Sequence, residues 1–94
     1  DIIRELAEFG VETFIHDPHA DPQAVWHEYQ IRLRSWASLP VAEATILAVP
    51  HQSFLERSPT EYMEKIIPDG CFIDIKAVLD IKPFKNHGIQ VWRL

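Results

Sequence analysis

The sequence predicts an α/β domain, in which helices cover both faces of a mainly parallel sheet. Three apolar runs, each of the kind expected for a buried strand, indicate this fold. A polar or charged residue stands just past each run, and these residues are Asp17, His51 and Lys76. Parallel strands buried on both faces are continuously apolar, and ligands bind beyond their carboxyl ends. We therefore expect Asp17, His51 and Lys76 to converge on one edge of the sheet, where the function should lie.

Length and composition limit the chain to one globular domain. Its 94 residues lie near the lower end of the size that buries an adequate core. With 47% hydrophobic residues, the chain can bury enough apolar surface to offset its conformational entropy. The formal net charge of -5 argues against a surface that neutralises the phosphates of a nucleic acid.

The single cysteine, Cys71, excludes an intrachain disulfide and a four-cysteine zinc site. It fits a reducing compartment, so the cytoplasm is the expected location. No stretch approaches about 18 consecutive apolar residues, and the amino terminus is charged and amphipathic, unlike a signal peptide. We expect neither membrane insertion nor secretion.

A helix and a strand are predicted to open the chain. Apolar residues recur at helical spacing and stop at Gly10, a residue typical of helix ends; they are Ile2, Ile3, Leu6 and Phe9. Residues 11–16 then read as a strand, reached by a short turn at Gly10.

The next segment predicts a capped helix and two short elements. Asp21 followed by Pro22 starts a helix over residues 22–29, because the carboxylate can cap free amides and proline fits the first turn. Residues 31–34 alternate apolar and basic side chains, as in a short edge strand. Residues 40–44 are interpreted as a single helical turn.

The middle of the chain predicts a central strand and two helical segments. Residues 44–49 are apolar on both faces, and Pro50 stops the strand. Residues 52–57 suggest one or two helical turns. Residues 58–61, Ser-Pro-Thr-Glu, supply a capping box that starts a new helix. Its apolar face would comprise Tyr62, Met63, Ile66 and Ile67.

The last part of the chain completes a Rossmann-like pattern. Pro68-Asp69-Gly70 is interpreted as a turn, and residues 71–75 and 88–94 as strands. The order of elements is the alternation of a Rossmann-like three-layer sandwich. Such a unit begins with a strand, whereas this chain begins with a helix. We therefore expect a fragment of a longer polypeptide that lacks the first strand.

The candidate site residues each have a structural alternative. Asp17 could bind a ribose or form a turn with Pro18, and His51 could lie at a site rim or start a helix. Asp74, within a strand, is expected to bond to a neighbouring loop and is also a possible rim residue. Lys76 suits a diphosphate or ribose, or is simply solvated. Cys71 is expected to be inert.

A metal site can be imagined near the first strand. His16, Asp17, His19 and Asp21 are residue types that bind zinc. Their spacing does not match one helix face, and Pro18 fixes an extended turn. Turn and cap chemistry explains the same residues, so we predict no metal.

Three ordered motifs carry a family resemblance. Residues 17–21, 44–54 and 72–80 resemble, in order and spacing, the carboxyl-terminal domain of the nucleotide-sugar 6-dehydrogenases, which include the UDP-glucose, UDP-N-acetylhexosamine and GDP-mannose enzymes. The similarity extends over essentially the whole chain, including the opening helix and the closing strand. Residues 1–94 would then be the UDP-sugar-binding domain of a longer enzyme.

The resemblance implies an NAD-dependent oxidation of a sugar C6 alcohol to a carboxylate, which supplies uronates for polysaccharide biosynthesis. In this family an amino-terminal Rossmann domain holds NAD, and a central region supplies the catalytic cysteine and a dimer contact. Both lie outside this chain, so we expect no catalytic residue here and no activity of the chain alone. The partners implied are a UDP-sugar and the rest of the parent dehydrogenase.

Lys76 is the residue to which the resemblance gives a role. It stands where many UDP-glucose dehydrogenases have an arginine, in an Asp-Gly-Arg pattern that contacts UDP. The form here, Asp74-Ile75-Lys76, is more similar to the dehydrogenases of UDP-N-acetylated hexosamines. Lysine is a point charge and cannot reproduce the planar, bidentate fork of arginine.

Two further expectations follow. The alternative to an enzyme part is a free-standing α/β interaction or regulatory module that has kept the fold without the chemistry. The missing first strand would leave an open edge beside residues 11–16, so we expect self-association as a homodimer.

Overall fold

The computed structural model describes residues 2–93. The chain divides into two units, Asp1–Pro40 and Val41–Leu94. The parallel sheet lies in the second unit, and each unit is described by itself.

The two predicted helices of the first unit are confirmed. Helix α1 spans Ile2–Glu8, and Gly10 follows it with a φ of 77°. Helix α2 spans Pro22–Tyr29. The Asp21 carboxylate accepts a hydrogen bond from the backbone N–H of Gln23 at 3.0 Å, as its position before proline predicted.

The strand predicted over residues 11–16 is wrong. In its place the structure has one isolated parallel bridge, between Ile15 and Leu33. The short edge strand predicted over residues 31–34 is wrong for the same reason, since this bridge is its one pairing. The backbone N–H of Arg34 donates to the Ile15 carbonyl at 2.8 Å. No described side chain of residues 2–40 is fully buried, so apolar alternation here has no core on which to build a ladder. The open sheet edge expected beside residues 11–16 therefore has no strand to border it.

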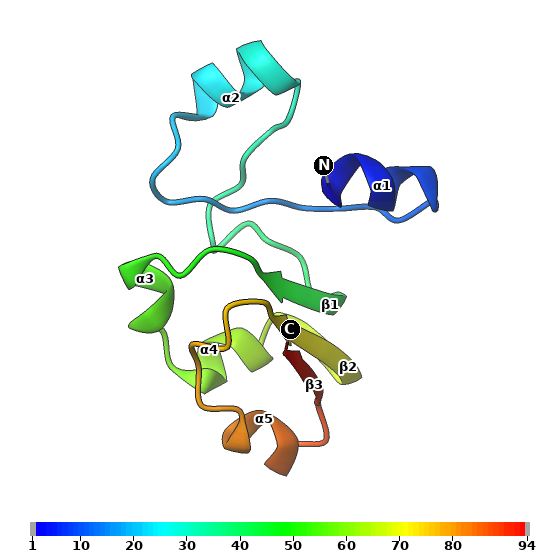
Figure 1. Ribbon diagram of the computed structural model, residues 1–94, viewed down its shortest axis with the longest axis vertical. Helices are drawn as coiled ribbons and strands as arrows, with labels where there is room; N and C mark the ends of the chain where they lie inside the picture. The colour runs from blue at the N-terminus through cyan, green and yellow to red at the C-terminus, as the bar shows by residue number, and fades with distance from the viewer. Residues whose placement is uncertain (1, 94) are drawn as a thin grey trace. The chain divides into compact units, whose positions relative to one another are not determined.

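The second unit is a parallel α/β fold (Figure 1). Strands β1 (Ala42–Leu47), β2 (Ile66–Asp74) and β3 (Gln90–Arg93) pair in the order β1-β2-β3, and both pairs are parallel. Helices α3 (Gln52–Leu55) and α4 (Pro59–Met63) connect β1 to β2, and α5 (Lys82–Asn86) connects β2 to β3.

This arrangement confirms a small Rossmann-like α/β fold. Two successive right-handed crossovers that step in one direction place their helices on the same face of a sheet. Accordingly, α4 contacts both β2 and α5, and α5 contacts β3.

The predicted capping box of α4 is confirmed. The Ser58 hydroxyl accepts from the Glu61 N–H at 3.3 Å, and the Glu61 carboxylate accepts from the Ser58 N–H at 3.2 Å. The Ser58 N–H bond and the Arg57 guanidinium lower the pKa of Glu61. Two orphan donors of the helix are thus satisfied by local sequence alone.

Two predictions around β1 and β2 are wrong. Residues 40–44 form no helical turn, because Ala42 already donates to the Lys65 carbonyl at 2.9 Å and pairs with Ile66. Pro68-Asp69-Gly70 is not a turn between elements but an irregular part of β2. The register shifts there, since Ala42 faces Ile66 whereas Ala44 faces Cys71. Proline is tolerated at such a bulge, where the ladder is interrupted.

Helix α5 was not predicted. It buries only Phe84, so it lacks the repeated apolar positions by which helices are recognised. A local sign was present, because the Asp80 carboxylate accepts from the Lys82 N–H at 3.1 Å and Pro83 lies in the first turn.

The core of the second unit is an aromatic cluster. Phe72 and Phe84 are fully buried and stack with centroids 4.7 Å apart and planes 9° apart. The Tyr62 ring lies 5.4 Å from Phe72, and its hydroxyl donates to the Phe54 carbonyl at 2.6 Å. Burial raises the pKa of Tyr62 to about 12. The cluster ties β2 to α4 and α5.

Candidate functional site

The three strands end together at one edge of the sheet. Leu47 at the end of β1 pairs with Asp74 at the end of β2, and Asp74 pairs with Arg93 at the end of β3. Because all three strands are parallel, the segments after β1 and β2 leave from this carboxyl edge. Such an edge is where ligands bind in open α/β sheets.

Lys76 lies in the turn directly after β2, and its side chain is exposed. The turn is fixed by the backbone: the Ile75 N–H donates to the Leu47 carbonyl at 3.1 Å, and the Ala77 N–H donates to the Asp74 carbonyl at 3.2 Å. Within residues 2–93 the Lys76 ammonium makes no hydrogen bond and no ion pair. It is therefore available to an anionic ligand.

Asp74 is the buried charged residue of the described chain, with no solvent exposure. Its Oδ2 accepts from the Leu79 N–H at 2.9 Å, which confirms the predicted bond to a neighbouring loop. Its Oδ1 finds no partner among residues 2–93. The side chain holds the segment after β2, and its role at the rim of a site stays a prediction.

His51 begins α3, as one of its two interpretations predicted. Its carbonyl accepts from the Phe54 N–H at 2.9 Å, and its ring lies 5.5 Å from the ring of Phe54. It is half-buried in the segment after β1, so the structure brings His51 and Lys76 to the same edge of the sheet. A role of His51 in binding stays a prediction.

Asp17 has a turn role in the first unit. Its Oδ1 accepts from the backbone N–H groups of His19 at 2.9 Å and Ala20 at 3.3 Å. Because residues 11–16 are not a strand of the sheet, the expectation that Asp17 follows such a strand is wrong. A role of Asp17 at the rim of the site stays a prediction.

The residues considered as zinc ligands have other contacts. The Nδ1 of His16 lies 2.8 Å from the Arg34 carbonyl, and its ring meets Trp36 edge to face. Across residues 2–93, no three His, Cys, Asp or Glu side chains lie close enough to share a metal ion. Cys71 is half-buried in β2 and forms no disulfide.

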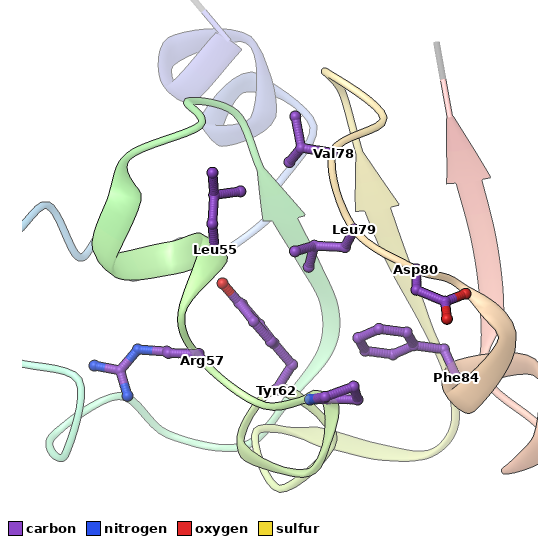
Figure 2. A pocket seen from close by; sticks show the side chains of 8 residues that line it. Leu55, Arg57, Tyr62, Val78, Leu79, Asp80 and Phe84 are labelled. Atoms are coloured by element: carbon purple, nitrogen blue, oxygen red, sulfur yellow. The ribbon is translucent and has the colours of Figure 1, made fainter.

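A pocket of about 220 Å³ lies between the segment after β2 and the helices (Figure 2). The segment after β2 forms one wall, and α3, α4 and α5 contribute the others. Its lining residues are Leu55, Arg57, Pro59, Tyr62, Val78, Leu79, Asp80 and Phe84. The Arg57 guanidinium is paired with Glu61 at 2.7 Å. Sequence reasoning missed this pocket because its walls depend on α5.

Arg93 is a residue that the sequence did not single out. It ends β3, and its guanidinium Nη2 donates to the Leu79 carbonyl. The sequence shows an arginine in the final predicted strand, but the carbonyl to which it donates depends on the register of that strand.

The residues present do not fit a dinucleotide site. A Rossmann dinucleotide fingerprint needs three closely spaced glycines. The three glycines here are Gly10, Gly70 and Gly88, and no two are near each other in sequence.

The fold and its carboxyl edge define a Rossmann-like α/β domain with a cation presented where nucleotide ligands bind. The UDP binding domain model of the UDP-glucose/GDP-mannose dehydrogenase family matches residues 1–81. The chain therefore belongs to this family, as its UDP-binding domain.

Two relatives agree with this assignment. The chain is 27% identical over 93 residues to protein CapL of Staphylococcus aureus, covering 99% of this chain and 22% of CapL. It is 30% identical over 80 residues to the UDP-N-acetyl-D-glucosamine 6-dehydrogenase of Pseudomonas aeruginosa, covering 85% of this chain and 19% of the relative. The chain thus spans about a fifth of their length.

No solved structure matches the chain. Among the described helices, none has the length and apolar character needed to cross a membrane.

Proposed function

We propose that this chain binds the UDP moiety of a UDP-N-acetylhexosamine within an NAD-dependent 6-dehydrogenase. The observation that carries the proposal is Lys76, an exposed ammonium beyond the carboxyl end of β2 in a UDP-binding domain. The Asp74-Ile75-Lys76 sequence and the relative that acts on UDP-N-acetyl-D-glucosamine support the choice of sugar.

In this proposal Lys76 donates charge-assisted hydrogen bonds to a phosphate or ribose oxygen. The NAD site and the catalytic cysteine belong to the rest of the parent enzyme. The product would enter polysaccharide biosynthesis in the cytoplasm. The family match favours this enzyme part over a free-standing interaction module.

A homodimer also remains a prediction. The edge strands of the described sheet are β1 and β3, so a second copy would pair with one of these and not with a strand over residues 11–16.

Replacing Lys76 by alanine in the full-length dehydrogenase should raise KM for the UDP-sugar about tenfold or more, since a hydrogen bond to a charged group contributes roughly 1.5 to 3 kcal/mol. KM for NAD should be nearly unchanged. Steady-state kinetics with each substrate varied in turn measures both values.

Lys85→Ala is the matched control, because Lys85 is an exposed lysine on α5. It removes the same charge and should leave both constants unchanged. If Lys76→Ala behaves like Lys85→Ala, Lys76 is a solvated lysine and the proposal fails.

The 94-residue chain alone should bind a UDP-sugar only weakly, with a Kd above about 1 µM. Lys76 is the one cation that the proposal assigns to the ligand here, and the remaining contacts are expected from the rest of the enzyme. Calorimetric titration with UDP and with UDP-N-acetylglucosamine measures this affinity. A submicromolar Kd would show that the site is complete within residues 1–94.

A further inference from the structure

The backbone N–H and carbonyl of Leu79 are both hydrogen-bonded to charged side chains. Its N–H donates to Oδ2 of Asp74 at 2.9 Å, and its carbonyl accepts from Nη2 of Arg93. Asp74 and Arg93 are register partners on the neighbouring strands β2 and β3, so their side chains emerge on the same face of the sheet. We call these three residues the Leu79 clamp.

The clamp fixes the far end of the segment that carries Lys76. The near end is held by the hydrogen bond from the Ile75 N–H to the Leu47 carbonyl. Between the two ends, Ala77 has a φ of 55°, a left-handed conformation that a residue with a Cβ adopts only at a cost. Such a conformation persists when its surroundings determine it. These contacts indicate that the segment adopts one defined backbone conformation.

Burying the side chain of Asp74 at this position costs free energy. It is fully buried, and only its Oδ2 has a hydrogen-bond partner within residues 2–93. A buried carboxylate loses its hydration, so a non-polar residue would be the simpler choice if this position only packed against the core. The hydrogen bond from the Leu79 N–H to its Oδ2 is the interaction that a non-polar side chain could not make.

We propose that Arg93 and Asp74 are positioning residues that hold Lys76 where it meets the UDP moiety, which rests on the proposed function of Lys76. A lysine side chain loses rotamer freedom when it binds an anion, so a backbone segment that is fixed beforehand avoids a further ordering cost. The clamp supplies that placement, and neither of its charged residues contacts the ligand.

Arg93→Met in the full-length dehydrogenase tests the proposal, because methionine keeps an apolar stem but has no donor for the Leu79 carbonyl. Arg93 is exposed, so the variant should keep its fold. We expect KM for the UDP-sugar to rise about three- to tenfold, the effect of one hydrogen bond, with kcat and KM for NAD nearly unchanged. Arg93→Lys, which keeps a donor, should recover most of the loss. Lys85→Met is the control for the lost charge.

A double-variant cycle separates positioning from direct binding. In the Lys76→Ala background, Arg93→Met should have no further effect on KM, because there is no ammonium left to place. An equal effect in both backgrounds would overturn the proposal, since Arg93 would then act without Lys76.

Amide hydrogen exchange gives a readout that does not depend on UDP. Arg93→Met should speed exchange over residues 75–79 and leave β1 unchanged. Unchanged exchange over residues 75–79 would refute the clamp itself. Faster exchange together with normal kinetics of Lys76→Ala would instead refute the proposed function of Lys76, and with it the positioning role.

Discussion

Phe84→Ala should lower the free energy of unfolding of the 94-residue chain by about 3–5 kcal/mol, the cost typical of emptying a buried aromatic site. Phe84 is fully buried and stacks on Phe72 with ring centroids 4.7 Å apart, and the centroid of the Tyr62 ring lies 6.3 Å away. Small domains have only about 5–15 kcal/mol of stability, so much of it would be lost. Urea denaturation followed by circular dichroism measures the change.

Phe9→Ala is the matched control, because it makes the same substitution at a side chain that is 85% exposed. It should change the free energy of unfolding by no more than about 0.5 kcal/mol. Equal losses in the two variants would show that the aromatic cluster is not the core of this chain.

The parts of the fold that could be predicted are those encoded by a few neighbouring residues. Asp21 before Pro22 determines the start of α2, and the capping box at Ser58 determines the start of α4. Both depend on hydrogen bonds between groups two or three residues apart, so no knowledge of the rest of the molecule is needed.

The predictions that were wrong concern elements whose conformation depends on residues distant in the sequence. The alternation over residues 11–16 predicts a strand, but a strand forms only where another strand provides a ladder, and here only Leu33 pairs with Ile15. Pro68-Asp69-Gly70 has every local sign of a turn. Pairing of β2 with β1 on both sides of it overrides that preference and makes it a bulge.

The candidate site divides in the same way. The position of Lys76 follows from the end of an apolar run, and the structure places it beyond β2 as predicted. The Leu79 clamp could not be predicted, because it requires the pairing of Asp74 with Arg93 across two strands. A residue at the end of a strand can thus be located from local pattern, whereas contacts between side chains of different strands emerge only from the register of the sheet.

Gly70 lies in the bulge of β2, close to the backbone of β1, and its replacement by alanine should cost up to about 3 kcal/mol. A Cβ there would lie 2.6 Å from Cγ2 of Ile66, 2.8 Å from the Glu43 carbonyl oxygen and 2.9 Å from the Ile67 carbonyl oxygen. Two of these atoms belong to the backbone, so rotation of a side chain cannot relieve the overlap and β1 must shift from β2.

Gly88→Ala separates this steric cause from backbone conformation. Gly88 has a φ of 77° and open space around it, so alanine there meets only the left-handed penalty of about 1–2 kcal/mol. Urea midpoints of both variants should therefore rank Gly70→Ala as the less stable. Amide exchange should also rise over β1 in Gly70→Ala alone, because only that variant pushes Glu43 away. A Gly70→Ala chain as stable as the unmodified one would mean that the bulge has room for a methyl group and that β1 and β2 are not in close contact there.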